Sequence, residues 1–401
     1  MQNTIRINED VTYLGSSDRR IALFENSYPL TNGVSYNTYL IDDGETALLD
    51  TADSAVMQAF MENLFSVLKG RKLDHLIIQH MEPDHCASLG LVVENFPEAK
   101  VYGTMQVKKM VQQFFGIDLG EKFVTVKEGD TLSVGKHMLQ FVAAPMVHWP
   151  EVMMTYDTCD KILYSADAFG TFGALSGNLY ADECDSWTAD LAEARRYYTN
   201  IVGKYGNNVQ AVLKKAQNLE ISMICPLHGP VIRKDLGYYL DKYDKWSSYT
   251  PEDKGVVIVY GSIYGGTANA ADCLATRLAS KGVKNIKMYD VSKTHVSELV
   301  AEAFRVSHLV LAAPTLDAGL FPAMETLLLE LKRKNLCKRT VALIENGTWA
   351  PVAAKEITGI LEAMKDMTIL PEKLTIRSTA APGDEAALEA LANALAADLN
   401  Q

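Results

Sequence analysis

The chain has 401 residues, of which 48% are hydrophobic and 22% charged, and its formal net charge is -12 at pH 7. This length predicts two or three domains, and the acidic balance argues against binding to nucleic-acid phosphates. No apolar run approaches the ~18 residues of a membrane span, and the first residues lack the pattern of a signal peptide. We therefore expect a cytoplasmic protein that binds neither nucleic acid nor membrane.

The N-terminal part predicts short strands that alternate with helices. Residues 37–50 predict a β-hairpin, residues 54–68 a helix and residues 73–79 a compact buried strand. Residues 186–205 form an amphipathic pattern that indicates one buried helix face. The apolar positions of that face are Trp187, Leu191, Ala194, Tyr198 and Ile201. These segments predict a first domain over residues 1–250.

A polar break at residues 247–254 contains Pro251 and predicts the linker to a second domain over residues 251–401. Beyond it, compact apolar runs alternate regularly with helical patterns. The expected strands are 256–260, 286–289, 309–313 and 341–344, and the expected helices are 267–280, 296–304, 323–331, 354–364 and 386–399. Such alternation is typical of a doubly wound parallel sheet.

Seven potential metal ligands occur where strand-like runs end, and four of them lie within six positions. Loops at strand ends can direct such side chains toward one common site. Imidazole and carboxylate groups together suit iron, and a carboxylate can bridge two metals roughly 3.5–4 Å apart. The candidates are His80, Glu82, Asp84, His85, His148, Asp167 and His228.

This pattern resembles the metallo-β-lactamase superfamily, except that Glu82 stands where its zinc enzymes carry histidine. Glutamate is a harder, anionic ligand, which favours iron over zinc. The variant with glutamate, together with the long intervals to the later ligands, is typical of the flavodiiron proteins. The resemblance implies one iron at His80, Glu82 and His148, and a second at Asp84, His85 and His228, with Asp167 as the bridge.

The resemblance also implies a role for Tyr197, which stands where the family places a tyrosine near the irons. Its hydroxyl could donate a hydrogen bond to a bound oxygen species. A tyrosine on an amphipathic helix can equally serve packing alone, and the sequence leaves both readings open.

A second motif lies at the start of the second domain, where residues 256–260 lead into a loop with three glycines and a helix. Backbone N–H groups and a helix N-terminus bind phosphate in this arrangement. Two later loops, residues 314–322 and 345–349, follow strands that would end at the same edge. The predicted FMN contacts are Ser262, Ile263, Tyr264, Gly265, Gly266, Thr267, Pro314, Thr315, Leu316, Asp317, Gly319, Asn346, Gly347, Thr348 and Trp349. FMN is favoured over FAD or NAD because no GxGxxG pattern is present, and Trp349 is the candidate to cover its ring.

The resemblance as a whole implies an α/β chain: a metallo-β-lactamase-like αββα sandwich followed by a flavodoxin-like doubly wound parallel sheet. It implies an oxidoreductase that reduces dioxygen to water, nitric oxide to nitrous oxide, or both, at two irons supplied with electrons through FMN. The six cysteines form no CxxC pair, so a separate rubredoxin-like donor is expected. The family further implies a head-to-tail homodimer or a dimer of dimers.

Two alternatives remain at this stage. A dinuclear zinc hydrolase with an accessory flavodoxin domain would share the fold, and Glu82 argues against it. A flavodoxin-type electron carrier could use the first domain as a docking scaffold, and the complete ligand set argues against that.

Overall fold

The computed structural model describes residues 2–184 and 191–400. The chain divides into two compact units, the first made of Met1–Tyr198 and Asn207–Tyr243, the second of Thr199–Gly206 and Asp244–Gln401. The boundary falls inside helix α8 (Leu236–Ser247), before the polar break at residues 247–254. Within the described ranges, no helix has the length and apolar character needed to cross a membrane.

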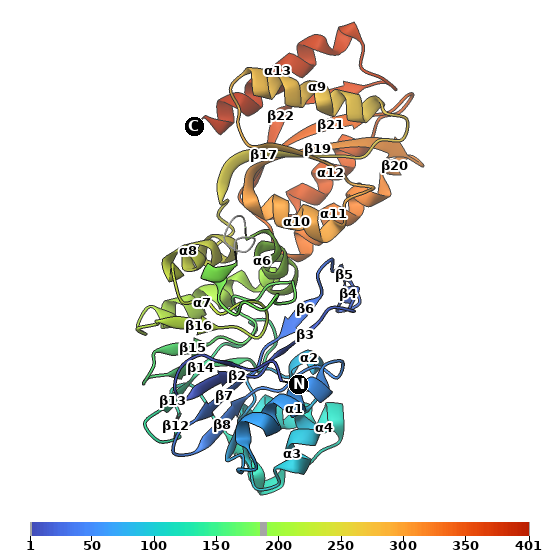
Figure 1. Ribbon diagram of the computed structural model, residues 1–401. Helices are drawn as coiled ribbons and strands as arrows, with labels where there is room; N and C mark the ends of the chain where they lie inside the picture. Colours follow the sequence, from blue (N-terminus) through green and yellow to red (C-terminus); the bar gives the residue numbers. More distant parts are fainter. Residues whose placement is uncertain (1, 185–190, 401) are drawn as a thin grey trace. The chain divides into compact units, whose positions relative to one another are not determined.

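The first unit contains two large sheets (Figure 1). The seven-stranded sheet has the order β1-β2-β7-β8-β9-β10-β11, and the five-stranded sheet has the order β12-β13-β14-β15-β16. The strands of the larger sheet are β1 (Ile5–Arg6), β2 (Val11–Tyr13), β7 (Tyr39–Asp42), β8 (Thr46–Leu49), β9 (His75–Ile77), β10 (Lys100–Gly103) and β11 (Phe123–Thr125). Those of the smaller sheet are β12 (Thr131–Ser133), β13 (Met138–Ala143), β14 (Met153–Asp157), β15 (Ile162–Tyr164) and β16 (Met223–Cys225).

Short strands and helices complete this unit. Two small ribbons pair β3 (Ser16–Asp18) with β6 (Val34–Tyr36) and β4 (Leu23–Phe24) with β5 (Tyr28–Pro29). The helices are α1 (Met57–Leu68), α2 (Pro83–Cys86), α3 (Leu89–Asn95), α4 (Met105–Phe115), α6 (Ala192–Tyr197), α7 (Gly206–Ala216) and α8, with 3-10 turns at Gly120–Lys122 and Ala181–Glu183. Together the elements form the expected metallo-β-lactamase-like sandwich.

The core of the first unit lies between the two sheets. Ile41 and Ile77 from the larger sheet join Phe141, Ile162 and Tyr164 from the smaller sheet in one cluster of buried side chains. Each strand therefore offers one apolar face to the opposing sheet, as period-two alternation requires. This packing fixes both sheets and hence the loops at their edges, which carry the candidate ligands.

The second unit is built on a parallel sheet of order β18-β17-β19-β21-β22, with β20 paired antiparallel to β19. This is the strand order 2-1-3-4-5 of flavodoxin-like folds, as expected from the sequence. The strands are β17 (Asp253–Tyr260), β18 (Ile286–Asp290), β19 (Val306–Leu316), β20 (Gly319–Leu320), β21 (Arg339–Asn346) and β22 (Met367–Ile376). The helices are α9 (Gly266–Ser280), α10 (Val296–Arg305), α11 (Pro322–Arg333), α12 (Ala353–Glu362) and α13 (Glu385–Leu399), with 3-10 turns at Gly203–Tyr205 and Pro382–Asp384.

Alternate residues of the central strands fill two separate cores. Val257 and Val259 of β17 pack in the cluster that includes α10, α11 and α12. Val256 and Ile258 pack on the opposite face with α9 and α13. Burial on both faces explains why these strands are continuous apolar runs in the sequence.

Three expectations about elements need correction. The pattern over residues 186–205 is not one regular helix: α6 ends at Tyr197, a π-helical turn covers Tyr198–Val202, and residues 185–190, including Trp187, lie outside the described residues. Strand β22 was not predicted, because Pro371 and the charged residues Glu372 and Lys373 interrupt its apolar run. Strand β19 continues through Leu316, beyond the end expected at residue 313.

Candidate functional site

The seven predicted metal ligands come together at one edge of the first unit, where strands from both sheets end. The turn after β9 and the short helix α2 carry His80, Glu82, Asp84 and His85. His148 lies between β13 and β14. Strands β15 and β16 are parallel, with Tyr164 paired to Cys225, so Asp167 and His228 follow their strands at the same level. The common location therefore results from strand register.

One group of four side chains forms around Glu82 and Asp167. His80 Nε2 lies 3.2 Å from Glu82 Oε2 and 3.4 Å from Asp167 Oδ2. His148 Nε2 lies 3.1 Å from the same Glu82 oxygen and 3.2 Å from the same Asp167 oxygen. Two imidazoles and two carboxylates thus converge on one small volume.

A second group forms around Asp84. Its Oδ2 lies 3.3 Å from His85 Nε2 and 3.2 Å from His228 Nε2, and the two imidazole nitrogens are 3.0 Å apart. Asp167 Oδ1 lies 3.1 Å from His85 Nε2 and 3.8 Å from His228 Nε2. Asp167 therefore directs one oxygen to each group, as a bridging carboxylate would.

The donor atoms fit a pair of cations better than they satisfy one another. Both carboxylate oxygens of Asp84 and Oδ1 of Asp167 are buried without a hydrogen bond of good geometry, although imidazole nitrogens lie 3.1–3.3 Å from Asp84 Oδ2 and Asp167 Oδ1. Burial of charged oxygens that lack hydrogen bonds is costly unless a cation compensates them. The mixture of imidazole nitrogen and carboxylate oxygen, without a thiolate in either group, is also the chemistry that non-haem iron takes.

The electrostatics of the cluster show a deficit of positive charge. Burial raises the pKa of Asp167, but the imidazoles of His85, His80 and His148 outweigh burial and hold it well below its usual range. Burial likewise opposes the charged form of His148, yet Asp167 and Glu82 raise its pKa to about 9. The carboxylates thus favour positive charge at the imidazoles, which a bound metal cation would supply in place of protons.

Two further groups orient the histidines, and neither was predicted from the sequence. His80 Nδ1 donates to Glu151 Oε1 at 2.8 Å, and Glu151 is fully buried. His228 Nδ1 donates to the backbone oxygen of Ser35 at 2.7 Å. Such partners fix the tautomer and direct Nε2 to a metal. A carboxylate a few residues after His148 is too weak a sequence signal to identify Glu151, and a backbone acceptor leaves no signal.

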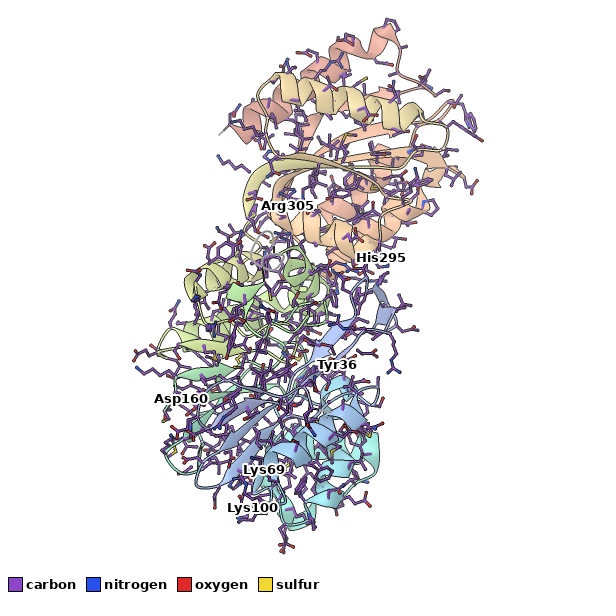
Figure 2. All side chains as sticks on the ribbon, viewed as in Figure 1. Tyr36, Lys69, Lys100, Asp160, His295 and Arg305 are labelled. Atoms are coloured by element: carbon purple, nitrogen blue, oxygen red, sulfur yellow. The ribbon has the colours of Figure 1, made fainter. Side chains whose placement is uncertain are left out.

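Tyr197 is fully buried, and its ring centre lies 5.4 Å from that of His228. Its hydroxyl has no hydrogen-bond partner, and burial, together with the charge of Asp167, raises its pKa well above the usual value. The side chain is therefore a neutral phenol beside the ligand cluster, and its catalytic role remains a prediction. Tyr36, labelled in Figure 2, packs edge-to-face against His228 from strand β6 with 5.7 Å between ring centres. It was not predicted from the sequence.

The predicted flavin residues lie at the carboxyl edge of the second sheet. The loop that begins at Gly261 precedes α9, and Ser262 Oγ accepts hydrogen bonds from the N–H groups of Gly265 and Ala268. Pro314, Thr315 and Leu316 lie within β19, not in a loop as expected. Asp317 forms the turn to Gly319 in β20, and Gly347 and Thr348 follow β21.

The exposure of these residues suits a bound ring system. The side chains of Ile263, Tyr264 and Trp349 are 44%, 99% and 86% exposed, whereas Thr267 and Asn346 are buried. Apolar and aromatic side chains exposed around a glycine loop can contact a flat apolar ligand. Buried polar groups between them stiffen the loops.

A fourth segment, at Ser378, connects the flavin loops. Asn346 Nδ2 donates to Thr267 Oγ1 at 3.2 Å and to the backbone oxygen of Ser378 at 3.0 Å, and Ser378 N–H donates to Asn346 Oδ1 at 2.9 Å. A Cβ at Gly266 would lie 2.0 Å from that Ser378 oxygen, so only glycine fits there. Ser378 was not predicted because strand β22, which precedes it, was not predicted.

The two units together define a class: a metallo-β-lactamase-like domain with a dinuclear ligand set, joined to a flavodoxin-like domain. The family model described as ODP family beta lactamase matches residues 34–229. An anaerobic nitric oxide reductase flavorubredoxin from Vibrio vulnificus is 32% identical over 86% of this chain and 70% of its own length.

Solved structures agree. Rubredoxin oxygen:oxidoreductase from Desulfovibrio gigas has a TM-score of 0.91 at 25% identity and covers 99% of this chain and 98% of its own. A flavoprotein from Thermotoga maritima has a TM-score of 0.89 at 26% identity with the same coverage. The chain belongs to the flavodiiron protein family. It is an oxidoreductase of the kind that carries a diiron centre and FMN, and the zinc hydrolase alternative is not favoured.

Proposed function

We propose that this enzyme reduces dioxygen to water, nitric oxide to nitrous oxide, or both. The observation that carries the proposal is the pair of ligand groups joined by Asp167. The relative from Vibrio vulnificus is named a nitric oxide reductase and that from Desulfovibrio gigas a rubredoxin oxygen:oxidoreductase. Reduction of dioxygen to two waters consumes four electrons and four protons, and two irons with one flavin can store these electrons between them.

The ligand assignment is part of the proposal. His80, Glu82 and His148 would hold one iron, and Asp84, His85 and His228 the other, with Asp167 between them. The distances within each group support this division. Tyr197 would donate its hydroxyl hydrogen to substrate, which its unpartnered hydroxyl beside His228 supports.

The flavin site is proposed at the carboxyl edge of the second sheet. The N–H groups at the start of α9 would bind the FMN phosphate, and the 345–349 loop would place Trp349 over the isoalloxazine ring. Only glycine fits at position 266, beside the Ser378 backbone oxygen, and Asn346 ties the loops together by hydrogen bonds. Both observations support a flavin site that is formed before FMN binds.

Electrons are proposed to arrive from a separate rubredoxin-like protein, and the active form is proposed to be a head-to-tail homodimer, alone or as a dimer of dimers. The relative from Desulfovibrio gigas is named a rubredoxin oxygen:oxidoreductase, which supports a rubredoxin-like donor. A cytoplasmic location is proposed because Cys86, Cys225 and Cys337 are buried free thiols, which suit a reducing compartment.

The proposed chemistry is tested by metal and flavin analysis of purified protein, followed by anaerobic reduction and parallel exposure to dioxygen and nitric oxide. Two irons and one FMN per chain, with rapid consumption of at least one gas, are expected. Protein that holds zinc when grown with ample iron, or that consumes neither gas when fully loaded, would contradict the proposal.

The dimer proposal is tested with mixed dimers. One chain carries His148→Ala, which removes a proposed iron ligand, and the other carries Gly265→Glu, which places a carboxylate where phosphate should bind. Each homodimer should be inactive, and the heterodimer should regain activity if electrons cross from the flavin of one chain to the irons of its partner. An inactive heterodimer, with the unmutated sites loaded, would show transfer within a single chain.

A further inference from the structure

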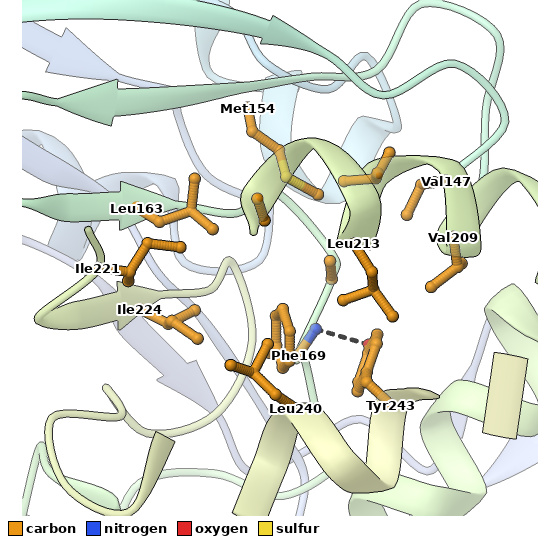
Figure 3. Close-up of a pocket in the computed structure, with 13 residues that line it drawn as sticks. Val147, Met154, Leu163, Phe169, Val209, Leu213, Ile221, Ile224, Leu240 and Tyr243 are labelled. Atoms are coloured by element: carbon orange, nitrogen blue, oxygen red, sulfur yellow. Dashed lines mark hydrogen bonds between the residues drawn. The ribbon is translucent and has the colours of Figure 1, made fainter. Parts of the chain in front are cut away.

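An apolar cavity lies in the first unit (Figure 3), and its lining includes residues next in sequence to two of the proposed iron ligands. It lies between β14, β15 and β16 on one side and helices α7 and α8 on the other. The side chains that line it include Val147, Ala168, Phe169, Leu213, Ala216 and Tyr243. The centre of a water-sized molecule can occupy about 20 Å³ of this cavity.

The cavity presents no polar atom to its interior. Tyr243 carries the one polar side-chain group in its lining, and that hydroxyl accepts a hydrogen bond from the backbone N–H of Phe169 at 2.6 Å. A water molecule needs two to four polar partners, so an apolar void of this size stays dry and takes up apolar molecules or xenon instead. The space is sufficient for a diatomic gas.

The position of the cavity relates it to the metal centre. Val147 immediately precedes His148, and Ala168 and Phe169 immediately follow Asp167. At the other side, Leu213, Ala216, Ile221 and Leu240 are only half-buried, whereas Val147, Ala168 and Phe169 are buried. The lining therefore runs from near the surface at α7 and α8 to the ligand-bearing segments.

We propose that this cavity binds the apolar diatomic substrate, dioxygen or nitric oxide, and supplies it to the metal centre. The inference rests on the proposed function, because only an enzyme of small apolar gases would use it. Such gases dissolve better in apolar surroundings than in water, so a dry cavity raises their local concentration. Water and ions would be excluded from the same apolar cavity.

Xenon tests occupancy without turnover. Crystals of the iron- and FMN-loaded protein under xenon pressure should show a xenon atom among Val147, Phe169 and Leu213. An empty cavity under xenon would overturn the proposal, whatever the enzyme's activity. A loaded enzyme that consumes neither gas would instead contradict the proposed function.

A matched pair of variants tests whether the cavity supplies the gas to the metal centre. Ala216→Leu adds side-chain volume inside the cavity, whereas Ala211→Leu makes the same change on the exposed side of the same helix α7. Ala216→Leu should lower xenon occupancy and reduce the second-order rate of reoxidation by each gas several-fold, with kcat at saturating gas unchanged. Ala211→Leu should match wild type in all three measurements.

A variant that enlarges the cavity keeps the test decisive if Ala216→Leu does not fold. Leu213→Ala enlarges the cavity and should raise xenon occupancy and the second-order reoxidation rate. Dioxygen and nitric oxide, measured separately, show which gas uses the cavity. Variants that change xenon occupancy but leave both second-order rates at the wild-type value would overturn the supply of substrate through this space.

Discussion

The metal centre and the flavin-binding edge of the second sheet differ in the burial and the charge of their side chains. The ligand cluster brings together buried charged groups that do not satisfy one another by hydrogen bonds, as the two oxygens of Asp84 show. The flavin edge gathers exposed apolar side chains, such as Tyr264 and Trp349, over a neutral network of hydrogen bonds around Asn346. The first site needs a cation to complete its electrostatics, and the second needs a ligand to cover its surface. The two cofactors should therefore be lost independently.

The largest effect is expected from Asp167→Ala. Because this carboxylate lies within reach of both ligand groups, its loss should cost more than the ~10–100-fold in metal affinity that removal of an orienting partner costs. Gas reduction should disappear while FMN remains bound, as iron analysis and the flavin absorbance would show. Asp272→Ala, at an exposed position of α9, is the control. Full iron content and turnover in Asp167→Ala would refute its role as the bridge.

Gly266→Ala should produce the converse loss. The added Cβ would meet the Ser378 oxygen at 2.0 Å, so the first flavin loop must shift and FMN affinity should fall strongly. Iron content should stay at the wild-type value. Gly359→Ala, where a Cβ meets nothing within 4 Å, is the matched control in the same unit. A Gly266→Ala protein purified with a full complement of FMN would contradict the proposed FMN site at this loop.

Glu151→Gln tests orientation rather than ligation. The amide keeps the size of the side chain but weakens the charge-assisted hydrogen bond to His80, so iron affinity should fall by about 10–100-fold. Titration with a competing chelator measures this change. Glu94→Gln, exposed on α3, should have no effect. An unchanged iron affinity in Glu151→Gln would mean that His80 is held by its packing alone.

The smallest effect is expected from Tyr197→Phe. Because the lost hydroxyl has no hydrogen-bond partner, thermal stability and both cofactors should be unchanged. Turnover should fall by less than about tenfold, equivalent to about 1.4 kcal/mol in the activation barrier. Tyr164→Phe removes another buried, unpartnered hydroxyl and should leave turnover at the wild-type rate. Equal turnover in both variants would reduce Tyr197 to a packing residue.

The sequence was informative where one residue type at one position carries the chemistry. The dense run from His80 to His85 and the glycine loop before Thr267 both indicated a site. The structure brings the metal-ligand candidates together and places the flavin-loop candidates at one edge of the second sheet. It was uninformative for partners that act through tertiary contact. Glu151 is a single carboxylate without a pattern, and Ser378 follows a strand that Pro371 conceals.

The prediction of one regular helix over residues 186–205 was wrong for a related reason. The apolar spacing over residues 186–205 suggested one regular helix, but Tyr198–Val202 forms a π-helical turn. Side-chain periodicity indicates which residues are buried and does not report the hydrogen-bond pattern of the backbone. Leu191, Tyr198 and Ile201 are buried as expected, although they do not share one α-helix.

The proposed ligands are drawn from both sheets of the first unit, since His80 follows β9 of the larger sheet and Asp167 and His228 follow β15 and β16 of the smaller. Iron bound there would cross-link the two layers of the sandwich. A ligand present at 100 times its dissociation constant stabilises the folded state by about 2.7 kcal/mol. Resistance of the first unit to heat and proteases would then depend on the supply of iron, and iron starvation would expose this unit, but not the flavodoxin-like one, to degradation.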